Sequence, residues 1–156
     1  MWGISFGNKE ELMAKKYKTG AFGTIYTQFK NKPKKAILHL MQVKEGEAMA
    51  AMFRDDIGFI DIVWGENNPI TNKGYGLKHI IEKHGKEIKQ LGFAVEDFIP
   101  IVVQYGNLNL KKSIDDKVVF ESKMFRLVIT TKHKGKNKQW LLSAFDLRPL
   151  NKKTSK

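Results

Sequence analysis

The sequence predicts an α+β domain in which N-terminal helices pack on a small antiparallel β-sheet. Apolar residues recur at helical spacing through much of the chain, whereas its last part alternates β-branched and aromatic residues with turns. A length of 156 residues, 42% of them hydrophobic, suits one domain with a single core. We divide the chain into an N-terminal extension (1–33), a main domain (34–149) and a basic tail (150–156) that we expect to be disordered.

The helices are predicted from caps and from apolar residues that recur every three or four positions. A first helix begins after Asn8 and ends near Lys18. A second helix begins at Lys34 and ends near Gly46, and its buried face is expected to comprise Ile37, Leu38, Met41 and Val43, with His39 on the surface. The clearest pattern belongs to a third helix, whose single apolar face comprises Leu77, Ile80, Ile81, His84 and Ile88. A fourth helix covers residues 95–105 despite Pro100.

The strands are predicted from β-branched and aromatic runs bounded by turn residues. Residues 23–29 are expected to form an edge strand, and residues 47–53 and 59–64 a hairpin, although Ala48 to Ala51 favours a helix. Residues 65–74 form a polar loop. The last part is a meander of three antiparallel strands over residues 117–121, 125–131 and 139–145, with an exposed lysine-rich hairpin loop over 132–138.

The charge of the chain favours a polyanionic partner. Its formal net charge is +12 and its pI about 9.8, which suits nucleic acid because released counterions drive such binding. A membrane surface would suit the charge as well, and a coding bias towards lysine is an alternative source of it. The chain has no cysteine, so disulfides, thiolate metal sites and cysteine nucleophiles are excluded. Without an evident secretory signal or apolar span, a cytoplasmic location without membrane association is expected.

Residues 74–85 hold the most informative motif, a glycine-rich helix start followed by His79 and His84. Two residues five positions apart lie about 140° apart around a helix, so the pair is unsuited to chelating zinc together. His84 lies on the apolar face, where the alternative to catalysis is a packed core histidine. His79 lies nearer the polar side and is expected to face solvent or substrate, the alternative being an inert surface residue.

A second group of candidates lies on the predicted meander. Arg126 alternates with Phe125 and Leu127, so it faces away from them and can present its guanidinium to phosphate; an ion pair with Glu121 or Asp61 is the alternative. Thr130 shares that face. Ser143 is either a hydrogen-bond donor in the site or a small buried hydroxyl. Asp61 and Trp64 border the loop before the histidine helix and are expected to position it, with core packing favoured for Trp64.

Three segments together resemble the phage-type nuclease domains of the barnase, EndoU, colicin and RelE-like superfamily, over about residues 36–147. They are residues 58–65 (GFIDIVWG), 74–84 (GYGLKHIIEKH) and 140–145 (WLLSAF). The resemblance implies helices packed on a small antiparallel sheet and metal-independent RNA cleavage without a cofactor. It implies as catalytic residues His79, His84, Arg126 and Ser143, with Thr130 as a weaker candidate.

The function expected from residues and resemblance together is that of an endoribonuclease of toxin or effector type. Such an enzyme acts in the cytoplasm or is delivered into a target cell. RNA is the expected partner, and an acidic immunity or antitoxin protein is a further one. Phosphate contacts are expected from Lys78, Lys132, Lys134, Lys136 and Lys138. Two other hypotheses stay open: a module that binds nucleic acid without cutting it, and an accessory protein of a phage or mobile element.

Overall fold

A computed structural model describes residues 17–71, 73–110, 113, 115–122 and 125–146 of the chain, with residues 142–146 described by their backbone alone. The described part is an α+β domain, as predicted, with three helices and a mostly antiparallel sheet, but the predicted placement of the helices at the N-terminus is not confirmed. Most of the helix expected from Asn8 to Lys18 lies outside the described residues. The described helices follow the first strands: they are α2 (Pro33–Val43), α3 (Gly76–Gln90) and α4 (Val95–Tyr105).

Eight strands form one sheet with the order β1-β2-β3-β4-β10-β9-β8-β7. Two of its pairings, β2 with β3 and β4 with β10, are parallel, and the others are antiparallel. The strands are β1 (Thr19–Gly20), β2 (Gly23–Tyr26), β3 (Glu47–Arg54), β4 (Gly58–Val63), β7 (Asn107–Leu108), β8 (Lys117–Glu121), β9 (Phe125–His133) and β10 (Lys136–Asp146). A separate two-stranded hairpin joins β5 (Glu66–Asn67) to β6 (Gly74–Tyr75). The predicted N-terminal extension thus contributes two strands to the sheet.

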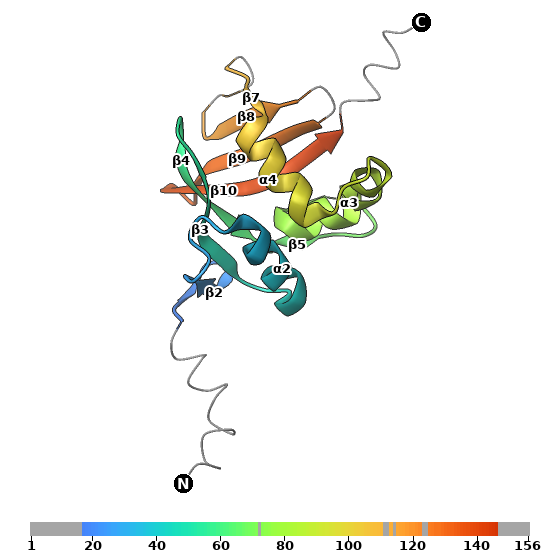
Figure 1. Cartoon of the computed structure of the whole chain (residues 1–156). Helices are drawn as coiled ribbons and strands as arrows, with labels where there is room; N and C mark the ends of the chain where they lie inside the picture. Colours follow the sequence, from blue (N-terminus) through green and yellow to red (C-terminus); the bar gives the residue numbers. More distant parts are fainter. Residues whose placement is uncertain (1–16, 72, 111–112, 114, 123–124, 147–156) are drawn as a thin grey trace, which may run out of the picture.

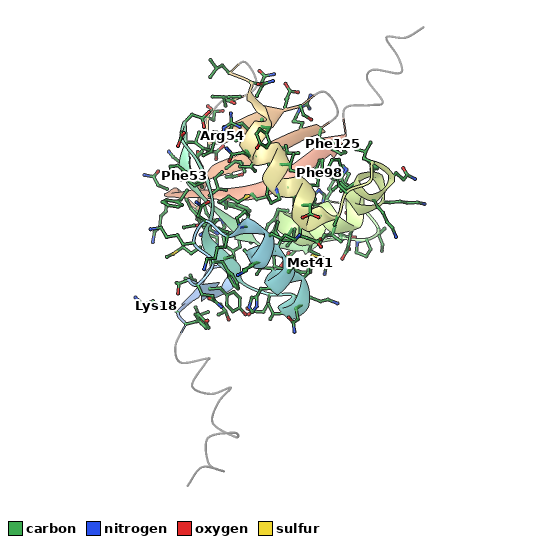
Figure 2. All side chains as sticks on the ribbon, viewed as in Figure 1. Lys18, Met41, Phe53, Arg54, Phe98 and Phe125 are labelled. Carbon is green, nitrogen blue, oxygen red and sulfur yellow. The ribbon has the colours of Figure 1, made fainter. Side chains whose placement is uncertain are left out.

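The helices cover one face of the sheet (Figure 1), where α4 lies across the strands and α3 lies beside β10. The core between helices and sheet includes Phe98 of α4 and Phe125 of β9, whose ring centroids are 4.3 Å apart in an edge-to-face contact. Figure 2 shows these two side chains next to each other. Arg54, at the end of β3, donates hydrogen bonds to the carbonyls of Val103 and Gly106, where a cation is favoured by the helix dipole. Arg54 therefore anchors the end of α4 to the sheet.

The second predicted helix is present as α2, but its buried face differs from the expected one. The residues that enter the core are Ala36, Ile37 and Leu40, whereas Leu38 and Val43 are exposed. His39 is half-buried rather than a surface residue, because its ring packs against Tyr26 at 4.4 Å and Phe29 at 5.1 Å. The segment before α2 folds back over the helix and covers a side that its own sequence pattern leaves polar.

The doubtful segment Ala48 to Ala51 belongs to strand β3, so the predicted hairpin of β3 and β4 is confirmed. The register between the two strands shifts between Ala48 and Met52, and Ala50 has a φ of 54°. This irregularity explains the weak strand pattern, because a bulged residue does not alternate with its neighbours. The backbone N–H of Ala50 is satisfied by Asp61 Oδ1 at 2.7 Å.

The predicted meander is confirmed as β8, β9 and β10, which pair antiparallel in that order. The strands run further than predicted, so the lysine-rich loop is reduced to a turn formed by Lys134 and Gly135. Both residues have positive φ, 49° and 80°, which matches the turn geometry favoured in tight hairpins. The side chains of Lys132, Lys134 and Lys136 are exposed around this turn.

Candidate active site

Close backbone packing places the start of the histidine helix α3 directly against the end of strand β4. Gly76 has a φ of 81°, and a Cβ atom there would lie 2.8 Å from the carbonyl oxygens of Val63 and Trp64. The N–H of Lys78 donates to the Trp64 carbonyl at 2.8 Å. A side chain at position 76 would thus separate the helix from the strand, which explains the glycine.

His79 is buried, with 4% of its surface exposed, so the expectation that it faces solvent is wrong. Its Nδ1 lies 2.7 Å from Oδ1 of Asn67, which belongs to the hairpin of β5 and β6. The physical reason is that this hairpin packs on α3 and covers a side of the helix that the sequence leaves polar. Burial, and secondarily the charge of Lys83, lower the pKa of His79 below its usual 6.5. At neutral pH the His79 ring is therefore uncharged.

His84 is buried on the apolar side of α3, as its position among Leu77, Ile80 and Ile88 predicted. Its Nδ1 lies 3.7 Å from Oε2 of Glu87, one turn further along the helix. The rings of His84 and His79 meet edge to face, with centroids 6.2 Å apart and planes at 86°. The two positions lie about 140° apart around the helix, but the side chains are long enough for the rings to meet.

Arg126 lies on β9 and faces away from Phe125 and Leu127, as predicted. Its Nε donates to Glu121 Oε2 at 3.1 Å, and both side chains are partly exposed. Of the two readings weighed for Arg126, the ion pair with Glu121 is therefore present. Such a pair holds the guanidinium in place and engages only one of its five N–H donors in this bond.

The remaining predicted catalytic residues, Thr130 and Ser143, lie on strands β9 and β10. Thr130 lies on β9 on the same side as Arg126, and its Oγ1 is buried without a hydrogen-bond partner among the described residues. Ser143 lies on β10 and pairs with Val128 of β9, but its side chain lies outside the described part of the structure. The structure thus brings the two histidines together on α3. Arg126 and Thr130 lie on the face of β9 that is turned away from α4, because Phe125 on the other face packs against Phe98. Both groups adjoin β10, which α3 contacts and β9 pairs with.

The predicted phosphate-binding lysines differ in their surroundings. Lys132, Lys134 and Lys136 are exposed at the hairpin turn, whereas Lys78 is half-buried on α3. Lys138 is not a free surface charge. It pairs with Glu47 and, at 2.7 Å, with Asp61. Burial alone would lower the pKa of Lys138, but its bonds to Asp61 and Glu47 outweigh burial and raise it.

Asp61 and Trp64 were both expected to position the histidine helix, and they behave differently. Asp61 accepts hydrogen bonds from Ala50 and Lys138, so it stabilises β3, β4 and β10 rather than α3. Trp64 is partly buried against the core, which is the role that the sequence favoured for it. Its carbonyl also accepts a hydrogen bond from the N–H of Lys78 at the start of α3. Asn67 and Glu82, which lie beside His79, were missed because neither stands out from the polar residues around it.

These surroundings predict how stability depends on pH. Burial is the largest cause of the lowered pKa of both His39 and His79, whose ordinary value is 6.5. Below that value the unfolded chain binds protons that the folded chain does not, so the free energy of unfolding should fall as the pH drops from about 7 to about 5. Urea unfolding across this range measures the slope. The double variant His39→Gln/His79→Gln should show a shallower slope, and an unchanged slope would contradict the burial argument.

Two adjoining imidazoles lie on a helix that packs against a mostly antiparallel sheet in a small α+β domain. A protein-family model described as phage-Barnase-EndoU-ColicinE5/D-RelE like nuclease 1 matches residues 51–150, and the chain belongs to this family. Comparison with curated proteins and with solved structures gives no match. No helix in the described part of the chain is long and apolar enough to cross a membrane.

Proposed function

We propose that this nuclease-family domain is a metal-independent endoribonuclease that uses the 2′-hydroxyl of RNA as its nucleophile. The observation that carries the proposal is the buried imidazole pair, with its centroids 6.2 Å apart, on the helix that packs against β10. Transesterification of RNA needs one group to accept a proton and one to donate a proton. Imidazole suits both roles near neutral pH.

The geometry favours His79 as the base. Its pKa is lowered, so the ring is neutral, and Asn67 occupies Nδ1, which leaves Nε2 to accept the proton. His84 would be the acid, with the Glu87 carboxylate 3.7 Å from its Nδ1 as a counter-charge for the protonated ring. In this role, His84 donates a proton to the leaving oxygen.

The reaction then balances as a displacement within the RNA. His79 takes the proton of the 2′-hydroxyl, the 2′-oxygen bonds to phosphorus, and the bond from phosphorus to the 5′-oxygen breaks. His84 protonates that leaving oxygen. The products are a 2′,3′-cyclic phosphate and a 5′-hydroxyl end. Arg126 would stabilise the charge that develops on the phosphorane, with Thr130 or Ser143 as a hydrogen-bond donor.

The experiment that tests the proposal is cleavage of a labelled RNA in EDTA, with analysis of both new ends. We expect a cyclic phosphate and a 5′-hydroxyl, and no cleavage of DNA of the same sequence or of an RNA with one 2′-deoxy substitution at the cut site. Cleavage that requires added metal, or that yields a 5′-phosphate, would contradict the mechanism.

A second candidate function is favoured by the burial of both histidines, which also suits a structural role. In this reading, the domain keeps the family fold and binds RNA through its basic surface without cutting it. Such a protein would shift RNA in a gel and leave its length unchanged. The cleavage assay above therefore separates the two functions directly.

The exposed lysines at the hairpin turn should contribute to RNA binding without reading bases. Replacing Lys132, Lys134 and Lys136 together with glutamine is expected to weaken binding and to reduce the salt dependence of log K by up to about 2, at ~0.7 per phosphate contact for single strands. The rate at which bound RNA is cleaved should be unchanged. Fluorescence anisotropy at several salt concentrations measures this. The control replaces Lys18, Lys35 and Lys89, which are exposed elsewhere, with the same loss of charge. Equal effects of the two triple variants would contradict a role for the hairpin.

A further inference from the structure

The hairpin of β5 and β6 holds one of its side chains against the histidine helix. Asn67 of β5 pairs with Gly74 of β6 and is buried, with 8% of its surface exposed. A Cβ atom at Gly74 would lie 2.2 Å from the Glu66 carbonyl, so the two strands approach as closely as backbone allows. Tyr75, the next residue, caps α3. The position of Asn67 relative to the first turn of α3 is therefore fixed by backbone packing.

The amide of Asn67 makes two hydrogen bonds to the same helix. Its Oδ1 lies 2.7 Å from Nδ1 of His79, and its Nδ2 donates to Oε1 of Glu82 at 3.1 Å. An ionised carboxylate only accepts hydrogen bonds, so Glu82 must face the NH₂ group of the amide. The amide oxygen consequently faces His79. Since this oxygen also only accepts, Nδ1 of His79 must carry a proton.

We propose that Asn67, oriented by Glu82, is a positioning residue that fixes the tautomer and orientation of His79 for catalysis. The neutral His79 ring then has its proton on Nδ1 and its lone pair on Nε2, the atom that must accept the 2′-hydroxyl proton. The Nδ1 proton is present in both the neutral and the charged ring, so the bond to Asn67 persists while Nε2 gains and loses a proton. Groups that hold the second nitrogen of a working histidine act in this way at other sites.

This inference rests on the proposed function, but it has a readout that does not require activity. The variant Asn67→Leu removes the acceptor and keeps a side chain of the same branched shape. The matched control is Asn68→Leu, because Asn68 bonds to the N–H groups of Ile70 and Thr71 in the same hairpin and so reports on hairpin disruption alone. Side-chain ¹⁵N NMR of His79 gives the tautomer and the pKa in each protein, and thermal unfolding reports whether each is folded.

In the wild type and in Asn68→Leu, we expect the neutral His79 ring to carry its proton on Nδ1. Asn67→Leu should lose this preference and lower kcat at least about tenfold, as when outer groups that hold a histidine are removed, with KM unchanged. Because a hydrogen bond from the charged ring favours that form, its loss should lower the pKa of His79 further. The acid limb of the pH profile of kcat should then move to lower pH.

A double variant tests the same contact in the opposite direction. Asn67→Asp combined with Glu82→Gln keeps both hydrogen bonds, because the new carboxylate accepts from His79 and from the new glutamine amide. The tautomer should be retained, whereas the negative charge should raise the pKa of His79 and move the acid limb to higher pH. A shift in the same direction as that of Asn67→Leu would overturn the inference.

The failure of the inference can be told from the failure of the proposed function. If wild type cuts RNA and Asn67→Leu cuts it equally fast with the same His79 tautomer, Asn67 has no positioning role and the endoribonuclease proposal stands. If wild type cuts no RNA, the endoribonuclease proposal fails, and with it the catalytic purpose of the contact. The NMR comparison still decides in that case whether Asn67 sets the state of the His79 ring.

Discussion

Replacing His79 with glutamine is expected to lower kcat for RNA cleavage about 100- to 10,000-fold, the usual contribution of one proton-transfer group. RNA affinity should stay close to that of the wild type, because His79 is buried and the proposed phosphate contacts lie on the hairpin turn. Single-turnover cleavage with saturating enzyme separates the chemical step from binding. Glutamine fills much of the space of the imidazole, which limits the cavity that alanine would leave.

The matched control for this variant is His133→Gln. His133 is half-buried against Phe22 and Trp140 at the start of the hairpin turn and belongs to neither candidate group. The His133→Gln protein should cleave RNA at the wild-type rate. Full activity in a folded His79→Gln protein would remove His79 from the mechanism and favour the module that only binds RNA.

Replacing Arg126 with glutamine is expected to lower kcat about 100- to 1,000-fold, which is typical when one donor to a developing negative charge is lost. The physical reason is that negative charge develops on the non-bridging phosphate oxygens in the transition state, so the loss should fall mainly on kcat. Arg126→Lys keeps the charge but not the planar set of donors, and an intermediate rate is expected. Steady-state kinetics on a short RNA give kcat and KM for the wild type, Arg126→Gln and Arg126→Lys.

The ion pair of Arg126 with Glu121 provides the control for this variant. If the arginine serves only that pair, Glu121→Gln and Arg126→Gln should destabilise the fold to a similar degree and affect cleavage alike. If Arg126 acts on RNA, Glu121→Gln should retain activity, because the glutamine amide oxygen can still accept the hydrogen bond from Nε and keep the guanidinium in place. Equal activity losses in the two variants would contradict a role for Arg126 in the chemistry.

The elements that could be predicted from sequence are those with long, regular patterns. The bounds of α4 and β8 were predicted to the residue, and α3 to within a turn, because their burial follows their own periodicity. Strands of two residues, such as β1, β5, β6 and β7, were missed since no alternation can be read in them. The parallel pairing of β4 with β10 joins Asp61 to Trp140 and depends on the complete fold.

The candidate site divides in the same way. The burial of His84 and the outward face of Arg126 follow from neighbours on their own helix and strand, and both were predicted. The burial of His79 depends instead on a hairpin formed by residues 66–75, which reads as a polar loop. Asn67 lies in that loop next to Asn68, and nothing in the sequence distinguishes the asparagine that reaches the helix from the one that turns the chain.

The tight turn between β9 and β10 has a consequence for how RNA would be held. Only Lys134 and Gly135 lie outside the two strands, so the lysines around the turn are carried by a paired hairpin rather than by a long loop. Little motional freedom is then lost when a phosphate docks, which favours binding. The hairpin is also continuous with β10, against which α3 packs. The distance between the phosphates bound at the turn and the bond that is cut would therefore be constant.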